Sequence, residues 1–328
     1  MQRPPMPPPI SSRPPGLWRD TPPAIFPPIM GLLGLGLSWR EATRTLGAPA
    51  GVGDMILGAA ALLLAFCMVA WLAKPVRRPG VIDEDLRVLP GRAGLAAMVL
   101  SLSLLAAALV PFTPGLAWTV LIAGASAHAV LIALVTRALL RGPDEARVVT
   151  PVFHLVYVGP ILLPLSLIPL GQPALANAIL WATIPVALAI WAASTAQLVQ
   201  RVPPAPLRPL LAIHLAPASL FATVATMLGL HTLGIASAIA AGAILLALLA
   251  SARWLTEAGF SPLWGAFTFP LAAFASALLT VSGGSGAAGI IGGVVLVVAT
   301  LAIPVIAYRV LQAWAKGTLA GRTNAAVA

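Results

Sequence analysis

The sequence is poor in charged residues and has almost no cysteine. Of its 328 residues, 9% are charged and 59% are hydrophobic, and the mean hydropathy is +0.98. Soluble domains carry about 25% charged residues, so this composition predicts an integral membrane protein. The single cysteine, Cys67, excludes both an intrachain disulfide and a cysteine-based zinc site.

Carboxylates are also missing from the interiors of the apolar runs. All nine acidic residues fall in tails, in loops or at the ends of runs. This excludes an intramembrane carboxylate for proton relay or sodium binding, and a magnesium site of clustered acids. We interpret the acidic stretch "DEDL" (83–86) as a solvated surface. No G-x-S-x-G elbow or Ser, His and Asp set occurs at one depth, so we expect no enzyme and no cofactor.

A net charge of +10 does not indicate a nucleic-acid partner here. The basic residues lie at the edges of long apolar runs and form no patch interleaved with polar surface. We therefore expect the partners to be the lipid bilayer and a small solute. The N-terminal residues have no apolar core typical of a signal peptide, and their prolines favour an extended tail.

Ten segments have the length and hydropathy of membrane-spanning helices, which need about 20 apolar residues. Short joints such as "PFTPG", "PLGQP" and "SGGSG" predict tight hairpins between neighbours. The fold class we predict is all-α integral membrane, with ten transmembrane helices in five hairpins. The predicted spans are 22–39, 52–73, 93–112, 115–140, 150–170, 173–199, 207–230, 232–254, 262–281 and 286–314.

Charge asymmetry predicts the orientation of the bundle. All of the 19 Lys and Arg residues except Arg40 and Arg44 fall at one end. By the positive-inside rule, both termini are cytoplasmic in a bacterial-type inner membrane. The domains expected are a disordered proline-rich tail (1–20), a ten-helix transmembrane domain (21–316) and a cytoplasmic C-terminal tail (317–328).

Proline is concentrated in the outward-running spans. Four of these five spans carry interior proline, whereas only two of the return spans do, and the third span, "RAGLAAMVLSLSLLAAALVPF", has none in its interior. Prolines in membrane helices are tolerated where neighbours or water satisfy the freed backbone groups. The outward set is therefore the better candidate to surround a pore, although incidental kinking would give the same pattern. The prolines expected to set kinks are Pro28, Pro160, Pro164, Pro217 and Pro270.

Histidines are the titratable groups left inside the spans. His128, His154 and His214 fall on three different spans, and no two of them have the i, i+3 or i+4 spacing of ligands on one helix. We expect no metal site. Packed, hydrogen-bonded histidines and a proton-linked role for His154 and His214 both remain open.

Four stretches in a fixed order carry a family resemblance. They are "IFPPIMGLLGLGLSW", "TPVFHLVYVGPILLPL", "HLAPASLFATVATML" and "LWGAFTFPLAAFA". Over residues 18–316 the chain resembles the tellurite-resistance and C4-dicarboxylate transporter family (TehA-like), which includes the plant guard-cell slow anion channels.

This resemblance implies a quasi-fivefold ring around a central pore, in a homotrimer with one pore per protomer. It also implies that the aromatic residue before the ninth-span kink, here Phe269, plugs the pore. Phe267 lies about 200° away around a helix and shares a face with Pro270 and Phe274. Ordinary core packing is the alternative role for Phe269.

The function predicted is that of an anion channel or passive transporter for small anions, such as halide, nitrate, organic acids or tellurite. A path without fixed charge suits an anion drawn by basic residues at its mouth. One alternative is a proton-coupled C4-dicarboxylate exporter that uses His154 or His214. A second is a membrane scaffold or enzyme without a conduit.

Overall fold

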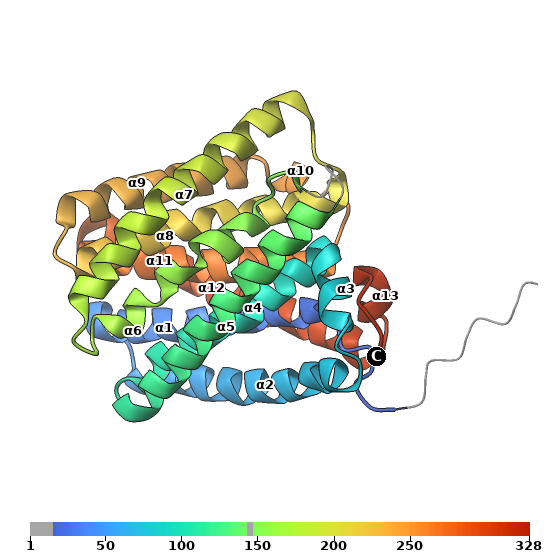
Figure 1. The fold of residues 1–328 in the computed structure, drawn as a ribbon. Coiled ribbons are helices and arrows are strands. Elements are labelled where there is room, and N and C mark those ends of the chain that lie inside the picture. Colours follow the sequence, from blue (N-terminus) through green and yellow to red (C-terminus); the bar gives the residue numbers. More distant parts are fainter. Residues whose placement is uncertain (1–15, 143–146) are drawn as a thin grey trace, which may run out of the picture.

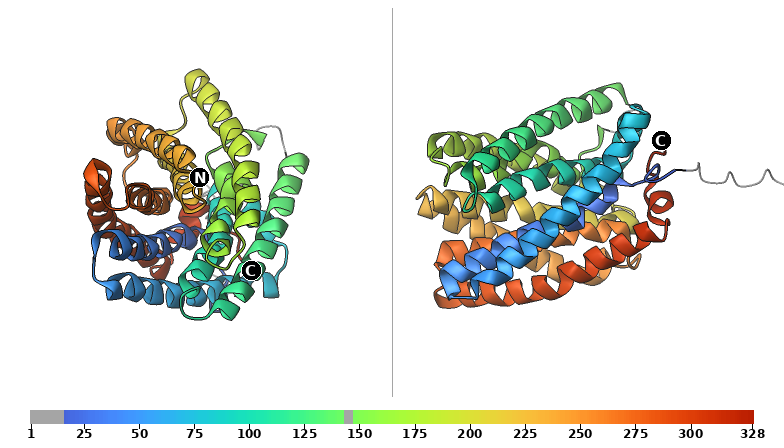
Figure 2. Two further views of the ribbon diagram at one scale, coloured as in Figure 1. Left: turned by 90° about the vertical axis from the view of Figure 1, so that its left-hand side faces the viewer. Right: turned by 90° about the horizontal axis from the view of Figure 1, so that it is seen from below.

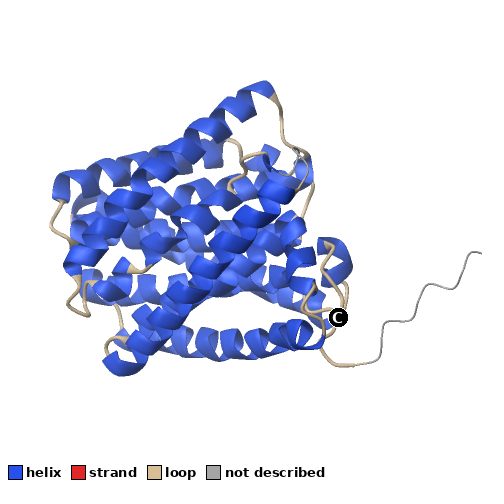
Figure 3. Ribbon diagram, viewed as in Figure 1, coloured by secondary structure: helices blue, strands red, loops and turns tan. Residues whose placement is uncertain are grey.

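The computed structural model describes residues 16–142 and 147–328, and helices form almost all of both ranges (Figure 3). Long helices run side by side, and short helices and turns close the two ends of the bundle (Figure 1). No strand occurs in either range. The all-α prediction is therefore confirmed for the described residues.

The elements follow the predicted hairpin order with small shifts at their ends. Turns at 110–113, 168–172 and 283–285 stand where the short proline- and glycine-rich joints were predicted. In chain order the elements are η1 (Pro23–Ile25), α1 (Phe26–Leu46), α2 (Ala50–Arg77), α3 (Val81–Arg87), α4 (Leu89–Leu109), α5 (Pro114–Arg141), η3 (His154–Val158), η4 (Gly159–Leu162), α6 (Pro164–Leu167), α7 (Pro173–Gln200), η5 (Ala205–His214), α8 (Leu215–Met227), α9 (His231–Ala250), α10 (Ala252–Leu255), η6 (Pro262–Phe267), α11 (Thr268–Ser282), α12 (Gly286–Ala315) and α13 (Leu319–Thr323).

Eight of the ten predicted spans are helices long and apolar enough to cross a membrane. The other two are also helical, but they are not among the eight. The first is α1, which carries Arg40, Glu41 and Arg44 in its second half. The second is the run 154–167, which is divided among η3, η4 and α6.

The helices separate into inner and outer sets (Figure 2). In the central windows of α4, η5–α8 and η6–α11, 67–78% of residues are buried, against 17–33% for the five other candidate spans. The inner elements contact one another in a closed order: α1 touches α4 and α11, α11 touches α8, and the run 154–167 touches α8 and α4. The outer helices expose large apolar side chains such as Leu62 and Ile239, as a lipid-facing surface requires.

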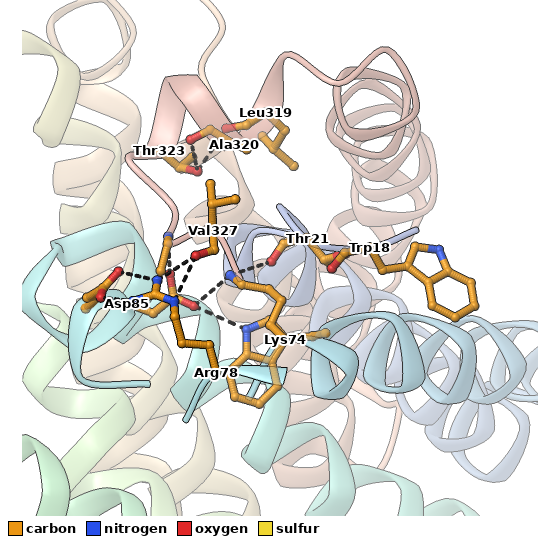
Figure 4. A network of polar contacts seen from close by, with 12 residues as sticks. Trp18, Thr21, Lys74, Arg78, Asp85, Leu319, Ala320, Thr323 and Val327 are labelled. Atoms are coloured by element: carbon orange, nitrogen blue, oxygen red, sulfur yellow. Dashed lines mark hydrogen bonds and ion pairs between the residues drawn. The ribbon is translucent and has the colours of Figure 1, made fainter. Parts of the chain in front are cut away.

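A buried ion pair lies at the end of the bundle where both described ends of the chain lie (Figure 4). The Nζ of Lys74 lies 3.0 Å from Oδ2 of Asp85, and both side chains are fully buried. Lys74 also donates to the carbonyl of Thr21, and Trp71 donates from Nε1 to Asp85. The prediction that "DEDL" is solvated is therefore wrong for Asp85, because residues far along the chain cover it.

The C-terminal residues provide that cover. The backbone N–H of Ala326 donates to Oδ1 of Asp85 at 2.8 Å, and Arg78 donates to the carbonyl of Val327. Leu319 and Thr323 of α13 are buried as well. Residues 317–328, predicted only as a cytoplasmic tail, thus pack against α2 and α3.

The described part of the N-terminal tail is tied to the same place. Residues 16–20 form a turn, and the N–H of Ala328 donates to the carbonyl of Arg19 at 2.9 Å. The Trp18 ring packs edge-on against Phe66 of α2. The rest of the predicted disordered tail, residues 1–15, lies outside the described residues.

We expect Asp85→Asn to destabilise the protein by about 3–5 kcal/mol, because it leaves the Lys74 ammonium buried without its counter-charge. Thermal melting in detergent measures this. The matched control is Glu84→Gln in the neighbouring exposed pair with Arg78, whose guanidinium lowers the pKa of the Glu84 carboxyl. Exposed pairs contribute little to stability, so the control should melt as the wild type does.

The double change Lys74→Met with Asp85→Leu should recover most of the loss, because it removes both buried charges together. Equal melting temperatures for Asp85→Asn and Glu84→Gln would contradict the assignment of this pair as a structural constraint.

Candidate functional site

The predicted kink prolines lie where new helical segments begin. Pro28, Pro217 and Pro270 are each the third residue of α1, α8 and α11. The first turn of an α-helix has no intrahelical acceptor for its N–H groups, so a proline there loses no bond. A short 3₁₀ stretch precedes each of these helices, namely η1, η5 and η6. Each of these three prolines thus lies just after a junction between a 3₁₀ helix and an α-helix.

The run 154–167 is the most broken inner segment. Its η3 is a single π-helical turn, η4 is 3₁₀ with Pro160 at its second position, and α6 begins at Pro164. Because Pro160 has no N–H, the carbonyl of Val156 four residues earlier loses its α-helical donor. The Nε2 of His128 on α5 lies 2.8 Å from that carbonyl oxygen. His128 therefore has a structural role as the replacement donor.

The span without an interior proline behaves differently. Helix α4 is continuous from Leu89 to Leu109, and its one early proline, Pro90, falls in the first turn. It still joins the inner set, since most of its residues are buried. An unbroken helix can therefore occupy a place in this set.

Three small cavities lie among the inner elements, and Phe269 lines all three. The first cavity has a volume of about 40 Å³, the middle one about 20 Å³ and the far one about 30 Å³. Water needs roughly 10–15 Å³ of such space, so each cavity has room for a few waters at most.

The order of the lining residues places these cavities in a row. Along α4, Ala93 lines the first cavity, Leu100 the middle one and Leu104 the far one. The same order from the first cavity to the far one is found along α11, where Pro270 lines the first and Ser276 the far one. All five inner segments contribute residues, so the three cavities follow the long axis of the bundle.

The lining is apolar and uncharged. His154, at the middle cavity, is the one titratable residue among those that line the three cavities. The far cavity adds the hydroxyl-bearing residues Ser38, Thr223 and Ser276. Ser38 already donates to the carbonyl of Ala272 at 2.8 Å. Nowhere along the described lining does a carboxylate face these cavities.

The Phe269 ring is held in a notch on α1. A Cβ built on Gly34 would come 2.8 Å from Cδ2 of this ring, closer than real Cβ atoms approach. Phe267, the neighbouring aromatic residue, lines none of the three cavities and packs edge-on against Trp264. The structure therefore places Phe269, and not Phe267, between the cavities.

His154 and His214 come together from two inner segments. The Nε2 of His154 lies 2.9 Å from Nδ1 of His214, whose Nε2 lies 2.8 Å from Oγ of Ser194 on α7. The backbone carbonyl of His214 also accepts a bond from Trp191 Nε1. A polar chain thus runs from the middle cavity, where His154 stands, to an outer helix.

Several of these residues could not be found from the sequence. Gly34 stands within a glycine cluster that suits close packing of any kind, and Ser194 has no distinguishing neighbours. The sequence does carry a signal for His128: Pro160 leaves the carbonyl of Val156 without its α-helical donor, so a side-chain donor from another helix is expected there. No group of three or more potential metal ligands gathers within residues 16–142 and 147–328.

Gly34→Ala should lower the melting temperature in detergent, by about 1–3 kcal/mol of stability, because the added methyl overlaps the Phe269 ring. In a Phe269→Ala background the same change should cost much less. Gly58→Ala on α2 is the control, since a Cβ there has open space around it. Equal costs in both backgrounds would contradict the contact.

The sequence matches a known protein family over nearly its whole length. No match was found among curated proteins. Residues 20–311 match the SLAC1 family, described as voltage-dependent anion channels, which confirms the TehA-like resemblance read from the four sequence stretches. The match covers all five inner segments and their outer partners. The chain therefore belongs to the SLAC1 family of anion channels and transporters.

Proposed function

We propose that this protein is an anion channel or passive transporter whose conduit follows the row of three cavities and is closed by Phe269. The observation that carries the proposal is that this one ring lines all three cavities. Membership of the SLAC1 family supports anions as the solute. A membrane protein of this kind needs no catalytic residues, in keeping with a non-enzyme.

The chemistry of the lining favours anions over cations. Cation pathways use rings of carboxylates or of carbonyls to replace the hydration shell. The cavities have no carboxylate among their lining residues, and the carbonyls of Val156 and Gly265 are taken up by hydrogen bonds from His128 and Thr268. The surplus of arginine and lysine at the end with the termini would raise the local concentration of anions. Halide, nitrate, monovalent organic acids and tellurite fit this class.

The proposed closure combines a steric block with dewetting. A narrow apolar constriction excludes water, and an ion loses its hydration shell there without compensation. Cavities of about 20–40 Å³ on either side of the ring are too small for a hydrated anion. A local movement of Phe269 away from α1 would join them. The junction between η6 and α11 lies one residue before Phe269 and is the proposed hinge for such a movement.

The proposed arrangement in the membrane includes all ten helical segments. The inner five form a quasi-fivefold ring, and Pro28, Pro160, Pro164, Pro217 and Pro270 set its helix junctions. Both described ends of the chain lie together, as an even number of crossings requires. The excess of basic residues at that end supports a cytoplasmic location in a bacterial-type inner membrane. A homotrimer with one conduit per copy is proposed from the family resemblance.

Phe269→Ala should raise anion flux in proteoliposomes by about tenfold or more, equal to a barrier lowered by about 1.4 kcal/mol. Phe267→Ala is the matched control, because its ring lies away from the cavities. The assay uses chloride, nitrate and malate under an imposed membrane potential, without a pH gradient. Flux at background in both folded variants would refute the conduit and favour a scaffold or enzyme without one.

The contact of His154 with His214 favours a second candidate, a proton-coupled C4-dicarboxylate exporter. In this mechanism a proton moves along His154, His214 and Ser194 as the carboxylate passes the middle cavity. A pH gradient alone would then drive malate flux, and His154→Gln would abolish that coupling. His128→Gln is the control, since its amide can still donate to Val156. Malate flux that follows the membrane potential and ignores the pH gradient would exclude this candidate.

A further inference from the structure

A second hollow lies outside the inner set, between α3, the start of α4 and the end of α5. It has a volume of about 540 Å³, far larger than the cavities of the row. Four arginines line it, together with one acidic residue, and these are Arg87, Arg92, Arg137, Arg141 and Asp83. We call this hollow the basic pocket.

Arg92 is the buried cation of the basic pocket. Only 8% of the residue is exposed, and its Nε is buried without a hydrogen-bond partner among the described residues. The hydrogen bond that its Nη2 donates to the carbonyl of Arg87 is 3.5 Å long and therefore weak. A buried cation is costly unless it is paired or hydrogen-bonded, so an anion bound in the hollow would stabilise Arg92.

The other three arginines of the pocket are exposed, and they too lack a paired counter-charge among the described residues. Within the described residues none of them forms an ion pair with a carboxylate. The sequence after α5 includes Asp144 and Glu145, which lie outside the described residues. Even when both are counted with Asp83, the four arginines exceed the acids. The basic pocket therefore has a net positive charge.

Guanidinium groups match the oxygen atoms of a phosphate with two parallel hydrogen bonds. A hollow of about 540 Å³ is also within the usual size of a small-ligand site. Basic pockets between membrane helices on the side rich in arginine and lysine are typical sites for anionic lipid headgroups. Leu140, beside Arg141, exposes a large apolar side chain that suits a neighbouring acyl chain.

We propose that the basic pocket binds a phosphate-bearing anion, and that its position favours the headgroup of an anionic phospholipid as the source. This site is separate from the proposed conduit and does not depend on conduction. The two are close in sequence, however, because Arg92 lines the pocket and Ala93 lines the first cavity. An occupied pocket would hold the start of α4 in place.

The test measures retained lipid by native mass spectrometry of the whole protein from nanodiscs of phosphatidylcholine mixed with phosphatidylglycerol. The wild type should retain phosphatidylglycerol selectively. Arg137→Gln with Arg141→Gln should reduce that retention by about tenfold or more, as expected for two basic residues near the surface. The control is Arg201→Gln with Arg253→Gln, which removes the same charge from exposed arginines outside the pocket.

Two further measurements test the charge of the pocket and the source of the phosphate. Asp83→Asn removes the acidic lining residue and should increase retention. Pyrophosphate titrated onto protein in pure phosphatidylcholine nanodiscs tests a soluble ligand: binding that needs Arg137 and Arg141, without selective lipid retention, would assign the site to a soluble phosphate. Equal lipid retention by the pocket and control variants, together with no arginine-dependent pyrophosphate binding, overturns the proposal. Melting temperatures in pure phosphatidylcholine confirm that all variants fold.

Discussion

The backbone of the inner segments has to satisfy its hydrogen bonds without water, and the rest of the structure follows from this constraint. Each unsatisfied N–H or C=O within the hydrocarbon region costs several kcal/mol. A proline removes one donor, so the chain either restarts a helix at the proline or finds a donor elsewhere. In α1, α8 and α11 the helix restarts. In the run 154–167 the donor comes from His128 on the outer helix α5.

This constraint explains why the outer helices carry a few polar groups on their inward faces. Trp191 on α7 donates to the carbonyl of His214, at the junction of η5 and α8. Within η6 and α11, the hydroxyl of Thr268 donates to the carbonyl of Gly265 at 2.7 Å. Each accepting carbonyl lies at or near a junction between helix types, where regular bonding is interrupted. The broken inner helices and their outer partners thus form one hydrogen-bonded unit.

Eight of the ten predicted spans are helices long and apolar enough to cross a membrane, because the thickness of the bilayer sets the length that such a helix needs. Ten apolar segments could be counted, and the turns between them carry the expected glycine and proline residues. Which loop residues are buried by the folded chain could not be predicted from hydropathy and charge. Asp85 stands in an acidic loop that any charge count assigns to solvent, yet it accepts a bond from Ala326, 241 residues away. Whether such a carboxylate is buried or solvated depends on contacts between residues far apart in the sequence.

The same limit applies to the candidate site. The rotation between Phe267 and Phe269 could be reasoned from helix geometry, and the two rings do lie in different surroundings. Phe267 contacts Trp264 because residues three apart overlie each other in the 3₁₀ helix η6. The pairing of His154 with His214 had no local signal, since 60 residues separate them.

The position of that histidine pair bears on how a closed conduit could respond to conditions. A hydrophobic constriction can close a pathway by dewetting, so the polarity of its walls matters. The middle cavity is apolar except for His154, which shares it with Phe269. In the proposed conduit, a proton on His154 would therefore act in the same cavity that Phe269 is proposed to close. The two proposed mechanisms, channel gating by Phe269 and proton coupling through His154, would therefore use the same cavity.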